Sequence, residues 1–140
     1  MNLYLDSSVV LRVVLGETGV LPEWRRVQRA FASELVRLEC LRTIDRARIR
    51  RSIPDGDVAD RRAAVLEILA GVELVTVDEE ILRRASDPFP TSLGSLDAIH
   101  LASALRVREE FSDLDVATHD EQLGTAARAL GFRVFGVGAR

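Results

Sequence analysis

The sequence predicts a single three-layer α/β/α domain, in which helices cover both faces of a mainly parallel central sheet. Two observations predict this fold class. Short apolar strands alternate with longer segments of helical periodicity, which is the order of βα units joined by crossovers. The chain also has 140 residues, of which 47% are hydrophobic, enough to bury one core. We expect one domain over residues 1–140, without a linker, an internal repeat or a low-complexity segment.

The first half of the chain predicts one strand, three helices and one undecided segment. Hydroxyl side chains of Ser7, Ser8 and Ser33 stand where helices begin and can accept their first free N–H groups. Gly71 stands where a helix ends. We expect, in chain order, a strand over 2–6, a helix after Ser7, a turn over 16–22, an ambiguous segment over 23–32 that could be a helix followed by a short strand around Val27–Ala32, and helices over 34–51 and 57–70.

The second half predicts three strands and three helices. Runs of Val, Leu and Thr predict strands, Asp78 is an N-cap candidate, and Gly131 ends the last helix. We expect, in chain order, a strand over 73–77, a short helix from Asp78 to about residue 85, a loop over 87–94, a helix over 95–110, a strand over 115–118, a helix over 120–130 and a strand over 132–137.

Composition excludes several kinds of site and of location. The chain has no lysine, which rules out a P-loop of the usual kind and any Schiff base. Cys40 is the single cysteine, so no internal disulfide forms, which suits a reducing compartment. Residues 1–16 lack a basic leader and no apolar run approaches the roughly 20 residues of a membrane span. We therefore expect a cytoplasmic protein that does not enter a membrane.

Four acidic residues stand at element ends or at the margin of an apolar face. Asp6 and Asp120 follow predicted strands, Glu39 lies beside the apolar stripe of its helix, and Asp97 lies in a first helical turn. Each has a structural explanation by itself: an N-cap, an ion pair with Arg42, or a favourable position in the helix dipole. Ligands bind beyond the carboxyl ends of parallel strands, so these four acids could also meet at one edge of the sheet.

Acids gathered in this way need a cation. Two carboxylates about 4 Å apart repel by roughly 1 kcal/mol in water and about 4 kcal/mol at an effective dielectric of 20. Only His100 and His119 are available beside Cys40, so no zinc site of Cys and His is predicted. Oxygen ligands favour Mg²⁺, with Mn²⁺ as a substitute, and such an ion among carboxylates is typical of phosphodiester hydrolysis.

Arginines are clustered although the net charge is −3. Arg46, Arg48 and Arg50 lie in the densest part of the cluster, and we expect them to contact RNA or a protein partner. A solvated helix face is the other explanation of such a cluster.

Four sequence blocks resemble the PIN-domain ribonucleases, and in particular the VapC toxins of VapBC toxin–antitoxin modules. The resemblance extends over essentially the whole chain and implies one PIN domain over residues 1–140. The blocks are Leu5-Asp6-Ser7-Ser8-Val9-Val10, Ser33-Glu34-Leu35-Val36-Arg37-Leu38-Glu39, Leu96-Asp97-Ala98-Ile99-His100-Leu101-Ala102 and Thr118-His119-Asp120.

The resemblance assigns roles to these residues. Asp6, Glu39 and Asp97 match the acidic metal site of the family and Asp120 its fourth acid, with Asp115 as a second candidate for that place. Ser7 and Thr118 match residues that support the site by hydrogen bonding. We interpret His100 as structural, with a local hydrogen bond inside its helix. His119 departs from the aromatic or apolar residue of the family.

The resemblance also implies an activity and partners. The activity is that of a Mg²⁺-dependent endoribonuclease, which inhibits translation by cutting structured RNA to leave a 5′-phosphate. The expected partner is a VapB-like antitoxin that blocks the acidic pocket. The expected oligomeric state is a homodimer. The alternative is a PIN-domain protein that processes or binds RNA without being a toxin. A metal-dependent binding module would need a serine at position 10, where Val10 stands.

Overall fold

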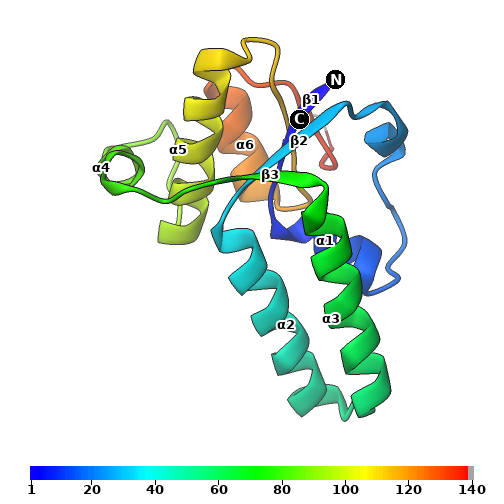
Figure 1. The fold of residues 1–140 in the computed structure, drawn as a ribbon. Helices are drawn as coiled ribbons and strands as arrows, with labels where there is room; N and C mark the ends of the chain where they lie inside the picture. The colour runs from blue at the N-terminus through cyan, green and yellow to red at the C-terminus, as the bar shows by residue number, and fades with distance from the viewer. Residues whose placement is uncertain (139–140) are drawn as a thin grey trace.

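The computed structural model describes residues 1–138 and contains a five-stranded, all-parallel sheet (Figure 1). The strands lie in the order β3-β2-β1-β4-β5. Their bounds are β1 Asn2–Leu5, β2 Arg29–Ser33, β3 Val72–Val75, β4 Asp115–Ala117 and β5 Val134–Phe135. Because all the strands are parallel, their carboxyl ends meet at one edge of the sheet.

Helices cover both faces of this sheet, as the sequence predicted. They are α1 Ser7–Val14, α2 Leu35–Arg51, α3 Asp55–Ala70, α4 Glu79–Ser86, α5 Ser95–Glu110 and α6 Glu121–Ala129, with a short 3-10 helix η1 at Pro22–Arg26. Leu3 and Leu5 of β1 face a core shared with α1, α2 and α3, whereas Tyr4 faces a second core shared with α5 and α6. This alternation follows from the two-residue period of a strand. The three-layer α/β prediction is confirmed.

Several predicted boundaries differ from the observed ones. The undecided segment 23–32 contains η1 and then β2, which is the helix followed by a short strand that we considered for it, and β2 continues to Ser33 beside β1. Helix α3 begins at Asp55 instead of residue 57, directly after Pro54. Strands β3 and β5 are shorter than predicted, since only the residues that pair with β2 and β4 are extended in the sheet.

The start of α1 is also different. Its N-cap residue is Asp6, whose side chain makes no capping hydrogen bond, so the predicted cap at Ser7 or Ser8 is wrong. The Ser8 hydroxyl instead donates to Asp6 Oδ1 at 2.6 Å. Ser33, in contrast, accepts the N–H of Leu35 at 3.2 Å at the start of α2.

The α2–α3 pair leads away from the sheet. Figure 1 shows α2 running outward from the carboxyl end of β2, with α3 returning beside it. The described residues include no helix with both the length and the apolar character needed to cross a bilayer.

Candidate active site

The candidate site lies at the carboxyl edge of the sheet, where β1 and β4 end side by side. Leu5 and Ala117 are partners in the sheet register, and Asp6 N–H donates to the Ala117 carbonyl at 3.4 Å. Asp6 and Thr118 therefore leave adjacent strands at the same level. Helices α2 and α5 bring Glu39 and Asp97 to this edge, and Asp120 begins α6 just beyond β4.

Asp6 is the most deeply buried of the four acids, with 5% of its surface exposed. Its two carboxylate oxygens accept from different hydroxyls: Oδ1 from Ser8 at 2.6 Å and Oδ2 from Thr118 at 2.9 Å. Burial raises the pKa of Asp6; these two donors and the charge of His100 oppose the rise, and the charge of Glu39 adds to it. The protein thus holds this carboxyl group rigidly and away from water.

Two hydroxyls connect the strand ends. Thr118 Oγ1 also accepts the N–H of Asp120 at 3.0 Å, and Ser8 Oγ accepts the N–H of His119 at 2.8 Å. The hydrogen bond from Ser7 Oγ to Glu39 is long, at 3.5 Å. The sequence analysis named Thr118 and Ser7 and missed Ser8, which stands one residue along the same block and has the shorter contacts.

The pKa of Asp97 indicates that the four acids influence one another. Its pKa is raised to about 6, first by burial and then by the negative charge of Asp120, with smaller contributions from Asp6 and Glu39. The charge of His100 opposes this rise. Side chains from four separate segments therefore share one electrostatic environment.

His100 has a role that the sequence analysis did not find. Its ring is 1% exposed, with Nε2 lying 2.6 Å from Glu39 Oε1 and Nδ1 lying 3.1 Å from Tyr4 Oη. The predicted local hydrogen bond within the helix is wrong, because the ring faces the sheet and α2. Burial lowers the pKa of His100, but the hydrogen bond and charge of Glu39, with the charges of Asp6 and Asp97, outweigh burial and raise it. The block around Asp97 contained the signal, since His100 lies one turn further along the same helix.

Asp120 combines a structural position with nearness to the acids. Its Oδ1 accepts the N–H groups of Gln122 and Leu123 at 2.8 and 3.0 Å and so caps α6. The same carboxylate raises the pKa of Asp97. Asp120 is therefore both the N-cap of α6 and a charged neighbour of the other acids.

Asp115 does not join the group. It is the first residue of β4 and pairs with Leu3, two residues before the carboxyl end of the strand. Both of its oxygens are bound by Arg133, with Nε at 3.0 Å from Oδ1 and Nη2 at 2.6 Å from Oδ2. Of the two candidates for the fourth acid, the geometry favours Asp120.

The donor chemistry of the site fits a hard divalent cation. Carboxylate oxygens predominate, and their mutual repulsion disfavours ionisation of Asp97 without a cation. Within residues 1–138, however, no three Asp, Glu, His or Cys side chains are grouped closely enough to form a ready metal cage. To hold an ion together, these acids would have to lie closer to one another than the structure places them.

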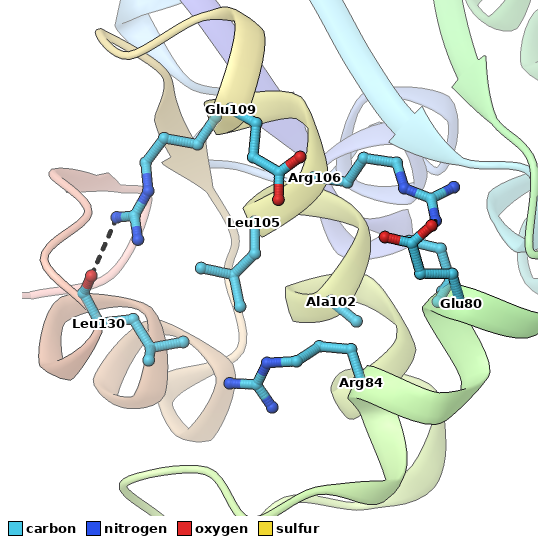
Figure 2. Close-up of a pocket in the computed structure, with 9 residues that line it drawn as sticks. Glu80, Arg84, Ala102, Leu105, Arg106, Glu109 and Leu130 are labelled. Carbon is cyan, nitrogen blue, oxygen red and sulfur yellow. Dashed lines mark hydrogen bonds and ion pairs between the residues drawn. The ribbon is translucent and has the colours of Figure 1, made fainter.

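The largest described cavity, about 470 Å³, lies elsewhere. It is formed between α4, α5 and the end of α6, and Figure 2 shows its mixed lining, with Arg84 and Arg106 beside Glu80 and Glu109. Arg108 also lines it and donates to the Leu130 carbonyl at 2.9 Å. None of the four acids lines this cavity, so its size does not identify the active site.

The three arginines predicted to contact RNA or a protein partner have different surroundings in the structure. Arg46 lines a cavity that also includes Glu39, and Arg50 lines the neighbouring cavity. Arg48 instead pairs with Asp45, with Nη2 at 3.3 Å from Oδ1.

Comparison with known proteins identifies the family. The sequence profile of the PIN domain matches residues 3–129. The chain belongs to the PIN-domain family. Three curated relatives come from Mycobacterium tuberculosis. Ribonuclease VapC46 is 32% identical, covering 94% of this chain and 95% of its own, and Ribonuclease VapC35 is 30% identical, covering 97% of each. Ribonuclease VapC47 is 28% identical and covers 98% of each chain. The PIN-domain residues expected from sequence therefore belong to a match that extends along nearly the whole chain.

Proposed function

We propose that this PIN-domain protein is the endoribonuclease toxin of a toxin–antitoxin pair, and that it hydrolyses RNA phosphodiester bonds with Mg²⁺ or Mn²⁺. The observation that carries the proposal is the electrostatic interaction of Asp97 with Asp6, Glu39 and Asp120 at the carboxyl edge of the sheet. The names of the VapC ribonucleases, similar over nearly their full lengths, support the same activity.

The four acids would hold the cation. A bound divalent ion supplies Lewis-acid chemistry, by making water a stronger nucleophile and by offsetting charge on the phosphate. Ser8 and Thr118 hold the Asp6 carboxylate in place. His100 fixes Oε1 of Glu39, and Oε2, which accepts the long hydrogen bond from Ser7, would be the oxygen offered to the ion. Asp120 keeps Oδ1 on the α6 backbone and would offer Oδ2.

The remaining expectations concern the cellular setting. The substrate is structured RNA, cut to leave a 5′-phosphate and a 3′-hydroxyl, and the result is inhibition of translation. The partner is a VapB-like antitoxin that covers the acidic pocket, the active form is a homodimer, and the protein acts in the cytoplasm. The net charge of −3 does not oppose RNA binding, because the arginines are concentrated on α2.

The test combines purified protein with expression in cells. Wild-type protein should cleave structured RNA with Mg²⁺ and lose activity in EDTA, and Asp6→Asn should be inactive while keeping its circular dichroism spectrum. Sequencing of RNA 5′ ends from expressing cells should reveal discrete cuts and accompany growth arrest. Cleavage without growth arrest would favour the alternative, an RNA-processing PIN-domain protein, whereas no metal-dependent cleavage would refute the nuclease proposal.

A further inference from the structure

One face of α2 carries arginines in line with Glu39. At about 100° per residue, Thr43, Arg46 and Arg50 lie within roughly 40° of Glu39 around the helix axis. Arg48 lies about 180° away, on the opposite face. We call Arg46 and Arg50 the arginine row. Because α2 runs outward from the sheet edge (Figure 1), the row leads away from the candidate acids.

Two neighbouring cavities follow this row. The first, of about 380 Å³, includes Ser7 and Glu39 at the candidate site and extends to Arg46. The second, of about 280 Å³, begins at Arg46 and extends to Arg50. Thr43 and Arg46 line both cavities, so the two adjoin at these residues. We call the two adjoining cavities the groove; it follows α2 from Glu39, the one of the four acids that lines it, to Arg50.

The charges of the arginine row are not neutralised by neighbouring acids. Among residues 1–138, no carboxylate forms an ion pair with Arg46 or Arg50. Arg46 has a hydroxyl contact, from Nη2 to Thr43 Oγ1 at 3.3 Å. Arg48, on the other face, is engaged with Asp45. The row therefore presents positive charge to the groove that leads from the acids.

The cavity beside Glu39 also has apolar walls. Leu38 and Leu96 line it and remain 59% and 51% exposed, which is high for leucines beside a cavity. These leucines come from α2 and α5, the helices that also supply Glu39 and Asp97. Apolar walls next to unpaired guanidinium groups suit a ligand that has flat apolar faces and a charged backbone.

We propose that this groove holds a single-stranded segment of RNA, with backbone phosphates on the arginine row and a base against Leu38 and Leu96. This inference rests on the proposed function, since it assigns the path of the RNA leading to the acids. It commits to RNA because the charge of the row is complementary to phosphates and because the groove begins at Glu39, one of the four acids. The row binds phosphates by bidentate hydrogen bonds, so it contributes affinity and salt dependence without reading sequence.

The experiment compares two double variants that remove the same charge from the same helix. Arg46→Ala/Arg50→Ala removes the row, and Arg37→Ala/Arg48→Ala removes two arginines from the opposite face as the matched control. Binding of a short fluorescein-labelled single-stranded RNA is followed by anisotropy in EDTA, so that no cleavage occurs, over a series of salt concentrations. Circular dichroism and the thermal midpoint check that both variants fold.

The row variant should bind at least 10-fold more weakly at low salt. Its log–log salt slope should be smaller by about 1.4, from about 0.7 for each phosphate contact on a single strand. The control should keep the wild-type slope. Leu38→Ala/Leu96→Ala should weaken binding while leaving the slope unchanged, because it removes apolar contacts only.

Two outcomes would overturn the inference. If both arginine variants weaken binding equally, the effect is one of total charge and not of the row. If the row variant binds RNA like wild type, the groove serves another partner such as a protein. Metal-dependent cleavage by wild type separates these results from failure of the proposed function. A wild-type protein that neither binds nor cleaves RNA would overturn both proposals.

Discussion

His100 Nε2 lies 2.6 Å from Oε1 of Glu39, which links α5 to α2 across the candidate site. The other ring nitrogen faces Tyr4 Oη, which also accepts the N–H of Ser33 at 3.0 Å. Burial raises the pKa of Tyr4 far above neutrality, so its phenol stays protonated and can serve as a fixed neutral partner for the ring. A buried series of hydrogen bonds, from Tyr4 of the central strand through His100 to Glu39, thus determines where Oε1 of Glu39 lies.

Breaking this series of hydrogen bonds should weaken metal binding. We expect His100→Ala to lower Mn²⁺ affinity, measured by calorimetry, about 10- to 100-fold, because the partner that orients Glu39 is lost. His100→Gln keeps an amide donor within reach and should recover part of the affinity. Tyr4→Phe removes only the hydroxyl, so it should lower stability through the unpaired Ser33 N–H, by about 1–3 kcal/mol, with a smaller effect on Mn²⁺. Wild-type Mn²⁺ affinity in folded His100→Ala would limit His100 to a packing role.

Asp97 should make the metal-free protein less stable as pH rises. Its folded pKa is about 6 against an ordinary value of 3.8, so between these values the folded state binds more protons than the unfolded state. The free energy of unfolding therefore falls with rising pH across that window, and the full loss remains above it. Relative to wild type in EDTA, Asp97→Asn should gain stability through about pH 4–6, reaching about 1 kcal/mol at neutral pH after allowance for solvent screening.

Denaturant titrations at several pH values measure this difference, and the comparison of two variants cancels the titration of other groups. Added Mg²⁺ should stabilise wild type, because it binds only the folded state, and should have little effect on Asp97→Asn. A pH-independent difference between the two proteins in EDTA would contradict the prediction.

Asp115 and Asp120 should respond in opposite ways to replacement by asparagine. Asp115→Asn weakens the two-point contact with Arg133 beside β4, so we expect lower stability, by about 1 kcal/mol, with Mg²⁺ stabilisation retained. Asp120→Asn keeps the cap of α6, since asparagine is an equally good N-cap, but removes a negative charge from the site. It should keep its metal-free stability and lose Mg²⁺ stabilisation. Thermal midpoints with and without Mg²⁺ measure both, and the reverse pattern would make Asp115 the fourth acid.

The fold could be predicted from local patterns, whereas the roles of the acids stay predictions. Alternation of strands and helices predicted the layers, and the position of Asp6 after a strand predicted the sheet edge, because parallel strands end together. What local patterns could not predict was pairing across the chain. The sequence left the segment 23–32 ambiguous, and the fold shows that its strand pairs in parallel with β1.

The contacts that support the acidic side chains also join residues far apart in the sequence. His100 meets a residue 61 positions away, and Asp115 meets Arg133 through adjacent strands. The division of the arginines between two helix faces, in contrast, follows from the predicted helix over 34–51 alone. Arg46, Arg48 and Arg50 are close in sequence, but rotation by about 100° per residue puts Arg48 on the opposite face from the other two.

Thr118 should be essential for the arrangement of the acids. Its hydroxyl donates to Asp6 Oδ2 and accepts the Asp120 N–H, so one buried group joins two of the four acidic segments. Thr118→Val has the same shape but cannot do either. We expect a loss of about 1–3 kcal/mol in stability, because a buried carboxylate oxygen and a backbone N–H lose their partner. The pKa of Asp6 should rise further, since a donor that opposes the effect of burial is gone.

Thr118→Ser retains the hydroxyl and provides the matched control. It should keep the Asp6 contact and lose only methyl packing, so its Mn²⁺ affinity should remain near that of wild type while that of Thr118→Val falls. Carbon-detected NMR of the Asp6 carboxyl group reports the pKa directly in EDTA. Equal Mn²⁺ affinity and equal Asp6 pKa in the two variants would mean that the hydroxyl does not hold Asp6, and Ser8 would then be the donor on which that carboxylate depends.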